Sequence, residues 1–459
     1  MIRRVVIFGA SGDLTSRYLL PALVQLDATG CLPEELQILG VAREAWDTET
    51  FRRHIAVHLQ RQSADVTLRS RQAVTAKLTY RQADVTDSSQ VARAIDPSGG
   101  PLVAYLALPP SMFAPTIEAL AAIGLPEECR IVIEKPFGAN LAAARALNQL
   151  LHQKFPEHAV FRIDHFLGKQ TVQNVLGIRF ANRVFEPLWN SHHIQRVEII
   201  WDETLALEGR ATYYDTAGAL KDMLQNHLLQ LLCLVGMEPP RTLHERDFRD
   251  RKVDVLRAVR RLSPAEIMSG TVRGRYGAGR IGDRVTPAYV DEQGVDPQRG
   301  TETFAQVRLL IDNWRWAGVP FFLRSGKALG RDRREIAIHF KPVPYLAFGP
   351  HPDPQPNVLR LQLDPDRVSL GVNINGPGDP FTLEWMELDM TLAPQSPPAY
   401  GRLLLDVLDG DPTLFIRDDE AEESWQIIEP ISALWAENKV PLLEYPAGSH
   451  GPEPPDTWQ

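Results

Sequence analysis

The feature that most constrains this chain lies at its start, where a strand, a glycine turn and a helix follow one another. A β-branched apolar run covers residues 5–8 and ends at the turn Gly9-Ala10-Ser11-Gly12-Asp13-Leu14, after which apolar residues recur with helical spacing. Such a turn lets the backbone approach a pyrophosphate, and the next helix offers it free N–H groups. The spacing G-x-x-G is shorter than the full motif G-x-G-x-x-G, so the turn alone fits an ordinary strand-to-helix connection equally well.

The end of the second predicted strand, residues 37–42, bears on the choice of cofactor. Arg43 follows this strand and Glu44 comes next. An arginine at this place favours a 2′-phosphate, whereas a carboxylate favours a free ribose hydroxyl. Ser11 offers a hydroxyl donor to the same phosphate. We therefore predict NADP, with NAD left open because of Glu44; a surface arginine without a ligand is the alternative reading of Arg43.

Further strands with proline turns complete an N-terminal α/β unit. Strand patterns cover residues 103–108 and 130–138, with helices and one strand predicted between residues 48 and 95. Ligands of open parallel sheets lie at the carboxyl ends of strands, so Lys135 is expected to meet cofactor or substrate; otherwise it is a solvated loop lysine. A helix at 140–155 and Pro156 close the unit. We predict a Rossmann-like dinucleotide-binding domain over residues 1–157.

The rest of the chain contains a series of strand patterns in place of alternating strands and helices. Strand patterns recur at residues 192–201, 303–311, 321–324, 335–340, 358–363 and 367–375, with apolar residues alternating in several of them. Successive strands without intervening helices indicate a mostly antiparallel sheet. The predicted fold class is therefore α/β plus α+β, with a substrate-binding and oligomerisation domain over residues 158–459.

Two segments of this second part carry titratable groups. A mostly apolar helix is predicted over residues 217–236, ending at Gly236, and His227 lies on its apolar stripe. In isolation such a histidine is a satisfied core residue or a general base held on a rigid helix. The second segment, residues 161–170, places Asp164, His165 and Lys169 within six residues, beside Gly168.

Composition excludes several classes of function. The chain has 49 Lys and Arg against 58 Asp and Glu, a formal net charge of −9, which repels nucleic acid. Its N-terminal apolar run is about four residues long, too short for a signal peptide or a membrane span. The three cysteines are widely spaced and are expected to be reduced and mostly buried. No metal site is predicted, and a cytoplasmic location is expected.

Four motifs stand out along the chain: the glycine turn at residues 9–14, Ile133-Glu134-Lys135-Pro136-Phe137-Gly138, Arg162-Ile163-Asp164-His165-Phe166-Leu167-Gly168-Lys169, and Asp222-Met223-Leu224-Gln225-Asn226-His227. In this order and spacing they resemble the glucose-6-phosphate dehydrogenase family. Further similar segments, at residues 180–183, 324–327 and 406–410, extend the resemblance over nearly the whole chain. It implies oxidation of glucose 6-phosphate to its lactone, with hydride transfer to NADP, in the pentose phosphate pathway.

The resemblance also implies residue roles. His227 is the expected base for the C1 hydroxyl proton, and Asp164 the carboxylate that orients its imidazole. His165 and Lys169 correspond to ligands of the substrate phosphate. Glu203 and Asp222 correspond to ligands of the sugar hydroxyls, and Lys135 and Lys327 to lysines that face the substrate. The expected cofactor-binding residues are Gly9, Ser11, Gly12, Asp13, Leu14, Arg43 and Lys135. Family members form homo-oligomers through the large sheet, so a dimer or tetramer is expected.

Four positions depart from the family pattern. Phe166 stands where tyrosine is usual, Gln170 replaces glutamate, Tyr18 replaces a lysine, and Asp332 replaces a basic residue between Arg331 and Arg333. These changes weaken anion binding, so they leave open a different phosphorylated, amino or unphosphorylated pyranose. A catalytically silent NADP-binding sensor is a third hypothesis.

Overall fold

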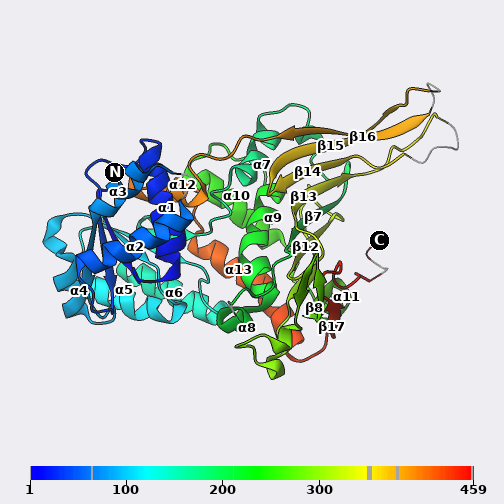
Figure 1. Ribbon diagram of the computed structural model, residues 1–459. Coiled ribbons are helices and arrows are strands. Elements are labelled where there is room, and N and C mark those ends of the chain that lie inside the picture. Colours follow the sequence, from blue (N-terminus) through cyan, green and yellow to red (C-terminus); the bar gives the residue numbers. More distant parts are fainter. Residues whose placement is uncertain are drawn as a thin grey trace. The chain divides into compact units, whose positions relative to one another are not determined.

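The chain passes more than once between two structural units (Figure 1). The computed structural model describes residues 2–63, 66–209, 211–348, 354–378, 382–455 and 458. Unit 1 contains Met1–Gln170, Arg241–Arg249 and Gln395–Glu422, and unit 2 contains Thr171–Pro240, Asp250–Pro394 and Glu423–Gln459. The predicted domain boundary at residue 157 stays a prediction.

Unit 1 is built on a parallel sheet. Its six strands follow the order β3-β2-β1-β4-β5-β6, so the order reverses between β1 and β4. This is the doubly wound arrangement, which binds ligands where the strand order reverses. The strands are β1 (Arg4–Phe8), β2 (Gln37–Ala42), β3 (Leu78–Gln82), β4 (Val103–Leu106), β5 (Arg130–Glu134) and β6 (Val160–Ile163). The predicted Rossmann-like fold is confirmed.

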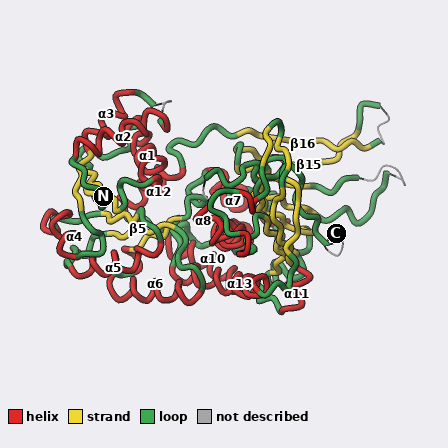
Figure 2. Tube along the Cα trace, turned by 60° about the horizontal axis from the view of Figure 1, so that its bottom comes forward, coloured by secondary structure: helices red, strands yellow, loops and turns green. Residues whose placement is uncertain are grey.

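Helices cover both faces of this sheet. Figure 2 shows α1, α2, α3 and α12 on one side of it and α4, α5 and α6 on the other. Asp47 and Asn140 cap α2 and α6, each through a side chain that accepts from a backbone N–H three residues on. The helices are α1 (Leu20–Ala28), α2 (Thr48–Gln62), α3 (Leu68–Lys77), α4 (Ser88–Ile95), α5 (Phe113–Ala122), α6 (Leu141–Lys154) and α12 (Ala399–Asp409).

The core of unit 1 includes side chains from near the end of the chain. Leu403, Val407 and Leu408 of α12 are buried in the same apolar cluster as strands β1 and β4 and helix α1. The backbone N–H of Ile2 also donates to the carbonyl oxygen of Leu408 at 2.9 Å. The α/β core is therefore completed by a segment almost 400 residues from its first strand.

Unit 2 is built on a nine-stranded sheet of order β16-β15-β14-β13-β7-β12-β11-β8-β17, with a separate hairpin β9–β10. Most neighbours are antiparallel, as predicted, but β12 pairs with β7 and β17 with β8 in parallel. In both pairs a long connection containing helices separates the strands, which permits the parallel direction. The strands are β7 (Ile194–Asp202), β8 (Thr271–Gly277), β9 (Gly279–Ile281), β10 (Arg284–Thr286), β11 (Phe304–Leu310), β12 (Pro320–Gly326), β13 (Arg333–Phe340), β14 (Val358–Leu363), β15 (Asp366–Asn375), β16 (Leu383–Thr391) and β17 (Leu442–Pro446).

The predicted helix at residues 217–236 consists of three pieces. Helix α8 (Ala211–Ala219) ends beside a kink, a π-helical segment spans Leu220–Leu228, and α9 (Leu229–Gly236) ends at the predicted glycine. The π-helical segment packs on strands β7, β11 and β12. The other helices are α7 (Gln170–Phe180), α10 (Glu245–Ala258), α11 (Pro264–Gly270) and α13 (Asp418–Ala436). No helix within the described ranges has the length and apolarity needed to cross a membrane.

Candidate active site

The glycine turn after β1 lies at the point where the strand order reverses. Gly9 has a φ of 81°, and a Cβ built on it would lie 2.3 Å from the carbonyl oxygen of Ala107, so only glycine fits. Its N–H donates to the carbonyl of Val41 at 2.9 Å, and the N–H of Gly12 donates back to Gly9 at 3.0 Å. The turn is thus fixed against the residue that follows β4 and against β2, where a pyrophosphate is expected in this fold.

The two residues after β2 divide their roles. The Ser11 hydroxyl donates to a Glu44 carboxylate oxygen at 2.8 Å. The Arg43 side chain is 93% exposed, and its Nε lies 3.8 Å from the other oxygen of Glu44. Glu44 thus accepts from the turn, whereas Arg43 extends into solvent, and binding of a 2′-phosphate by Arg43 stays a prediction.

The end of β5 contains a buried acid that the sequence did not single out. Glu134 accepts from the Tyr105 hydroxyl at 2.5 Å. Burial raises the pKa of Glu134 to about 7, although the Tyr105 hydrogen bond and the neighbouring Lys135 ammonium both lower it. Three residues beyond Lys135, Gly138 has a φ of 92° and would place a Cβ 2.4 Å from the backbone nitrogen of Ala144. Lys135 therefore sits in a turn with a fixed backbone, at the carboxyl end of a strand.

Asp164 begins the tight turn that follows β6. Its side chain is buried, at 1% exposed, and Oδ1 accepts from the backbone N–H of Phe166 at 2.9 Å. The N–H of Leu167 donates to the Asp164 carbonyl at 3.1 Å. The first bond orients the carboxylate and the second closes the backbone turn, at the carboxyl edge of the parallel sheet.

His165 belongs to a row of aromatic rings. It stacks on Tyr400, with ring centroids 5.5 Å apart and planes 10° apart, and meets the edge of Phe166 at 5.0 Å. Tyr18 lies against the far side of this row, 5.6 Å from Tyr400. Lys169 places its Nζ 5.6 Å from the centre of the Phe166 ring. Of the unusual residues, Phe166 thus contacts the imidazole directly, whereas Tyr18 contacts the ring of Tyr400. Tyr400 lies 235 residues downstream of His165, and no local pattern announces it.

Gly168 and Gln170 are held by one distant side chain. The Gln395 amide donates to the carbonyl of Gly168 at 2.7 Å and accepts from the N–H of Gln170 at 2.9 Å. A Cβ on Gly168 would lie 2.7 Å from the carbonyl oxygen of Ala399, which explains the glycine. Lys169 lies between these two residues, so its backbone position is fixed by the hydrogen bonds of Gln395.

His227 lies in unit 2 on the π-helical segment and is 1% exposed. Gly218, with a φ of 70°, breaks the preceding helix, and its missing Cβ makes room for the Glu302 carboxylate. That carboxylate accepts from the N–H of Leu220 at 3.0 Å, which caps the new helical start. The predicted helix is present but is not a continuous α-helix, because a kink at Gly218 and a π-helical segment change its register before His227.

Three side chains fix the other end of the helix that carries His227. The fully buried Arg179 donates to the carbonyls of Leu234, Val235 and Met237 at 2.8–3.0 Å. The indoles of Trp189 and Trp316 donate to Val235 and Gly236 at 2.9 and 2.7 Å. Burial lowers the pKa of Arg179 to about 10, so it remains charged at neutral pH. This cation at the helix carboxyl end complements the helix dipole.

Three predicted site residues of unit 2, Glu203, Asp222 and Lys327, contact polar or aromatic side chains of the same unit. Lys327 Nζ donates to Glu203 at 2.7 Å and lies 5.2 Å from the centre of the Tyr214 ring. Asp222 accepts from the Tyr213 hydroxyl at 3.2 Å. Burial raises the pKa of Tyr214 well above its ordinary value, and the charge of Asp222 adds to the rise. The structure therefore pairs Lys327 with Glu203 beside the Tyr214 ring, and it pairs Asp222 with Tyr213.

Asp332 has a structural partner beside this group. It accepts from the N–H and hydroxyl of Thr204 at 2.7 and 3.2 Å. Arg333, next in sequence, is occupied by Glu335 at 2.7 Å and Glu198 at 3.1 Å. Arg333 therefore does not replace the missing basic residue at this position.

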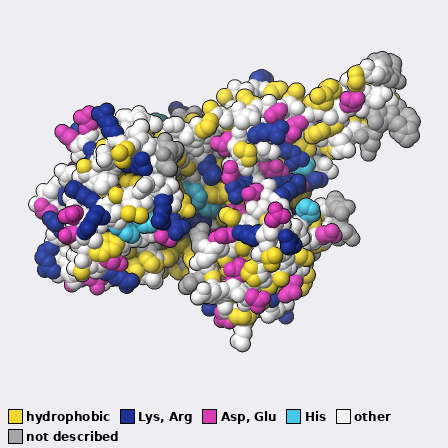
Figure 3. Space-filling view, in the orientation of Figure 1, with side chains coloured by type: hydrophobic (Ala, Val, Ile, Leu, Met, Phe, Trp, Pro, Cys, Tyr) yellow, Lys and Arg dark blue, Asp and Glu magenta, His cyan; other side chains and the backbone are white. Residues whose placement is uncertain are grey.

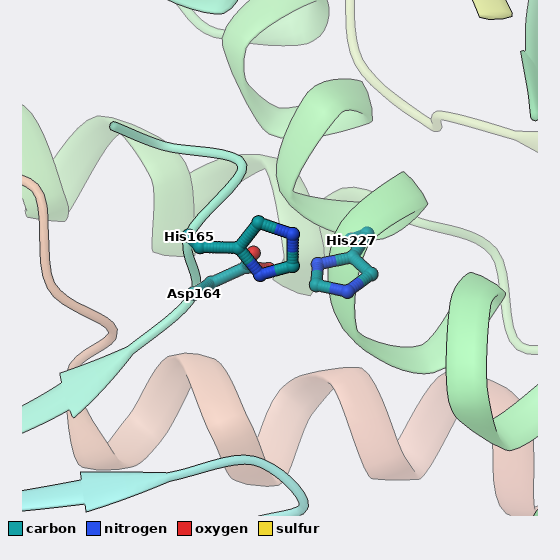
Figure 4. Close-up of side chains that lie close together, drawn as sticks. All are labelled: Asp164, His165 and His227. Atoms are coloured by element: carbon teal, nitrogen blue, oxygen red, sulfur yellow. The ribbon is translucent and has the colours of Figure 1, made fainter. Parts of the chain in front are cut away.

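Figure 4 draws the side chains of Asp164, His165 and His227 with the elements that carry them: the loop after β6 for the first two and the π-helical segment for the third. In unit 1, the candidate residues lie at the glycine turn and at the ends of β2, β5 and β6. In unit 2, they lie on the π-helical segment and at the ends of β7 and β12.

Comparison with known proteins identifies the family. The model of the glucose-6-phosphate dehydrogenase NAD binding domain matches residues 6–174, and the model of the glucose-6-phosphate dehydrogenase C-terminal domain matches residues 176–458. The chain belongs to the glucose-6-phosphate dehydrogenase family. It is accordingly an oxidoreductase, a sugar-phosphate dehydrogenase that uses NADP.

Relatives in the glucose-6-phosphate dehydrogenase family match over nearly their whole length. Glucose-6-phosphate 1-dehydrogenase of Treponema pallidum is 42% identical, covering 98% of this chain and 92% of its own. That of Mycolicibacterium smegmatis is 43% identical, with 97% and 94% covered. A solved glucose-6-phosphate dehydrogenase in complex with its substrate glucose-6-phosphate has a TM-score of 0.90 at 32% identity, with 98% and 95% covered. The Mycobacterium avium enzyme has a TM-score of 0.86 at 35% identity, with the same coverage.

Proposed function

We propose that this chain oxidises glucose 6-phosphate at C1, with His227 as the base that takes the hydroxyl proton and Asp164 as the residue that orients its imidazole. The observation that carries the proposal is the Asp164 turn: a buried carboxylate with one oxygen fixed by a backbone N–H, at the ligand edge of a parallel sheet. A hydride leaves C1 readily only when the hydroxyl proton is removed, and a His–Asp pair suits that transfer near neutral pH.

Substrate binding is assigned to cations in both units. His165 and Lys169 bind the phosphate through charge-assisted hydrogen bonds, and the stack on Tyr400 fixes the plane of the imidazole. Lys135 and Lys327 face the sugar. Glu203 and Asp222 accept from its hydroxyls, with the Lys327 ammonium oriented by Glu203 in advance.

Cofactor binding is assigned to the turn and strand ends of unit 1. Gly9, Ser11, Gly12, Asp13 and Leu14 form the backbone surface for the pyrophosphate, and Arg43 binds the 2′-phosphate. Lys135 lies near the nicotinamide end. When bound, NADP supplies the hydride acceptor.

Nicotinamide absorbance after mixing NADP and glucose 6-phosphate tests the reaction directly. We expect turnover by the wild type and by His158→Ala, a surface control, and no turnover above background by His227→Ala. Equal rates for His227→Ala and the wild type would contradict the assignment of the base.

The substrate itself needs a separate panel because Phe166, Tyr18 and Asp332 remove expected polar or basic groups. We expect kcat/KM to be highest for glucose 6-phosphate among phosphorylated, amino and unphosphorylated pyranoses. Losing one hydrogen-bonded group costs on the order of 1–3 kcal/mol, which a ranking of kcat/KM resolves. A higher value for another pyranose would overturn this choice of sugar without affecting the reaction type.

A homo-oligomer in the cytoplasm completes the proposal. Strand β16 exposes Met386, Leu388 and Met390 on one face, and Figure 3 shows hydrophobic side chains along this part of unit 2. Arg367 pairs with Glu387 and Asp389 on the other face, so the two faces differ in polarity. An exposed apolar face on an edge strand is suited to contact with a second copy of the chain. No disulfide joins Cys31, Cys129 or Cys233 within the described residues, which fits a reducing compartment.

A further inference from the structure

A group of metal-ligand type lies in unit 1, outside the residues assigned to the reaction. His152 is near the end of α6, Glu157 lies in the short turn before β6, and Asp418 is the first residue of α13. His152 Nε2 lies 3.3 Å from Glu157 Oε2 and 3.0 Å from Asp418 Oδ2. The three ligand atoms all lie within 4.8 Å of one another.

Hydrogen bonding alone accounts poorly for this convergence. One imidazole nitrogen carries at most one proton, so it donates well to only one of the two carboxylates that face it. A tetrahedral Zn²⁺ with ligands at about 2.0–2.1 Å sets neighbouring ligand atoms roughly 3.3–3.5 Å apart. The distances from His152 Nε2 to the two carboxylate oxygens, 3.3 and 3.0 Å, are close to that spacing.

Neighbouring residues orient the Glu157 carboxylate so that one of its oxygens faces His152. Glu157 Oε1 accepts from Arg162 Nη1 at 2.7 Å and from the N–H of Asp418 at 3.3 Å, which leaves Oε2 for the side of His152. Arg162 is fully buried, and its Nη2 donates to Asn148 at 3.0 Å. Asn148 in turn donates to the carbonyl of Asp418 at 3.1 Å. Outer residues of this kind orient ligands in metal sites.

Access and donor type complete the argument. The His152 side chain is 42% exposed, so an ion and a water ligand can reach the group from solvent. One imidazole and two carboxylates suit Zn²⁺ and similar transition-metal cations, whereas Mg²⁺ and Ca²⁺ prefer oxygen ligands alone.

We propose that His152, Glu157 and Asp418 bind a divalent transition-metal cation of the Zn²⁺ class, with water as the fourth ligand. The ion links the end of α6, the turn before β6 and the start of α13. The ion takes no part in the hydride transfer. Its binding increases the stability of unit 1 against unfolding.

Zinc titration of the full-length, chelator-treated protein tests the proposal, with a chromophoric zinc indicator as competitor. We expect the wild type and His158→Ala to bind one more equivalent of Zn²⁺ than His152→Ala and Asp418→Asn. His158 is an exposed histidine of the same turn, so it controls for nonspecific imidazole binding. Comparing stoichiometries also separates this site from zinc bound by the active-site histidines, which all four proteins retain.

A second measurement follows unfolding. At a free zinc concentration a hundredfold above Kd, the unfolding constant of the wild type falls about a hundredfold, and that of His152→Ala is unchanged. Equal stoichiometry in wild type and His152→Ala, or no saturable binding by the wild type, would overturn the proposal. If His152→Ala fails to fold, Asp418→Asn decides alone.

Discussion

The buried Glu134 carboxyl makes a specific prediction about stability and pH. The perturbation is Glu134→Gln, which keeps the shape of the side chain and an oxygen that accepts from Tyr105 but removes the titrating proton. Burial raises the pKa of Glu134 from 4.5 to about 7 in the folded protein. We expect the pH dependence of unfolding to differ between wild type and variant over this range.

The direction follows from proton binding. Between pH 4.5 and about 7 the folded protein holds the Glu134 proton, whereas the unfolded chain releases it. The stability contributed by the protonated group is therefore fully present below pH 4.5 and is lost as the pH rises through about 7. The difference of 2.5 pKa units, from 7 minus 4.5, corresponds to about 3 kcal/mol at 1.36 kcal/mol per unit.

Urea unfolding at a series of pH values between 4.5 and 8 measures this difference. We expect the free energy of unfolding of Glu134→Gln, relative to wild type, to increase with pH by about 3 kcal/mol. Glu127→Gln, an exposed position just before β5, should parallel the wild type throughout. Parallel curves for wild type and Glu134→Gln would refute the raised pKa.

Three further substitutions test the site residues. Asp164→Asn should lower kcat about 10⁴-fold by analogy with triad aspartates, with little change in KM, in steady-state assays; a loss under tenfold would contradict its role. Gly138→Ala should cost roughly 1–3 kcal/mol or more in unfolding, because it adds backbone strain to a close contact; an unchanged midpoint would contradict the turn geometry. Tyr400→Ala should raise the KM for the sugar phosphate and leave that for NADP unchanged, since it removes the ring stacked on His165; equal effects on both would argue for general damage.

Local patterns predicted much of the fold. Strands β2 and β14 have the predicted limits, and the helix expected at residues 140–155 is α6 (Leu141–Lys154). Apolar residues alternate in β14, β2 is, after its first residue, a continuous run of apolar residues with one glycine, and Asn140 caps α6. Strand β16 was not predicted, although the alternation of Met386, Leu388 and Met390 is a strand pattern; its acidic residues concealed it.

What the sequence missed depends on contacts between distant segments. The raised pKa of Glu134 comes from burial, and the ring that stacks on His165 comes from Tyr400 on helix α12. The parallel pairing of β7 with β12 requires a long crossover, whereas adjacency in sequence favoured antiparallel neighbours. The kink at Gly218 depends on Glu302, which lies 84 positions further along the chain. The roles given to Asp164 and His227 came from the family resemblance and stay predictions.

The late contribution of α12 to the first sheet bears on how this protein is made. A ribosome releases the strands of unit 1 first, but Leu403, Val407 and Leu408 arrive well over 200 residues after β6. At a synthesis rate of 5–20 residues per second, the apolar surface that α12 covers remains exposed for roughly 10–50 s. A fragment ending near residue 174, where the N-terminal family model stops, would expose the same surface permanently and should aggregate when expressed alone.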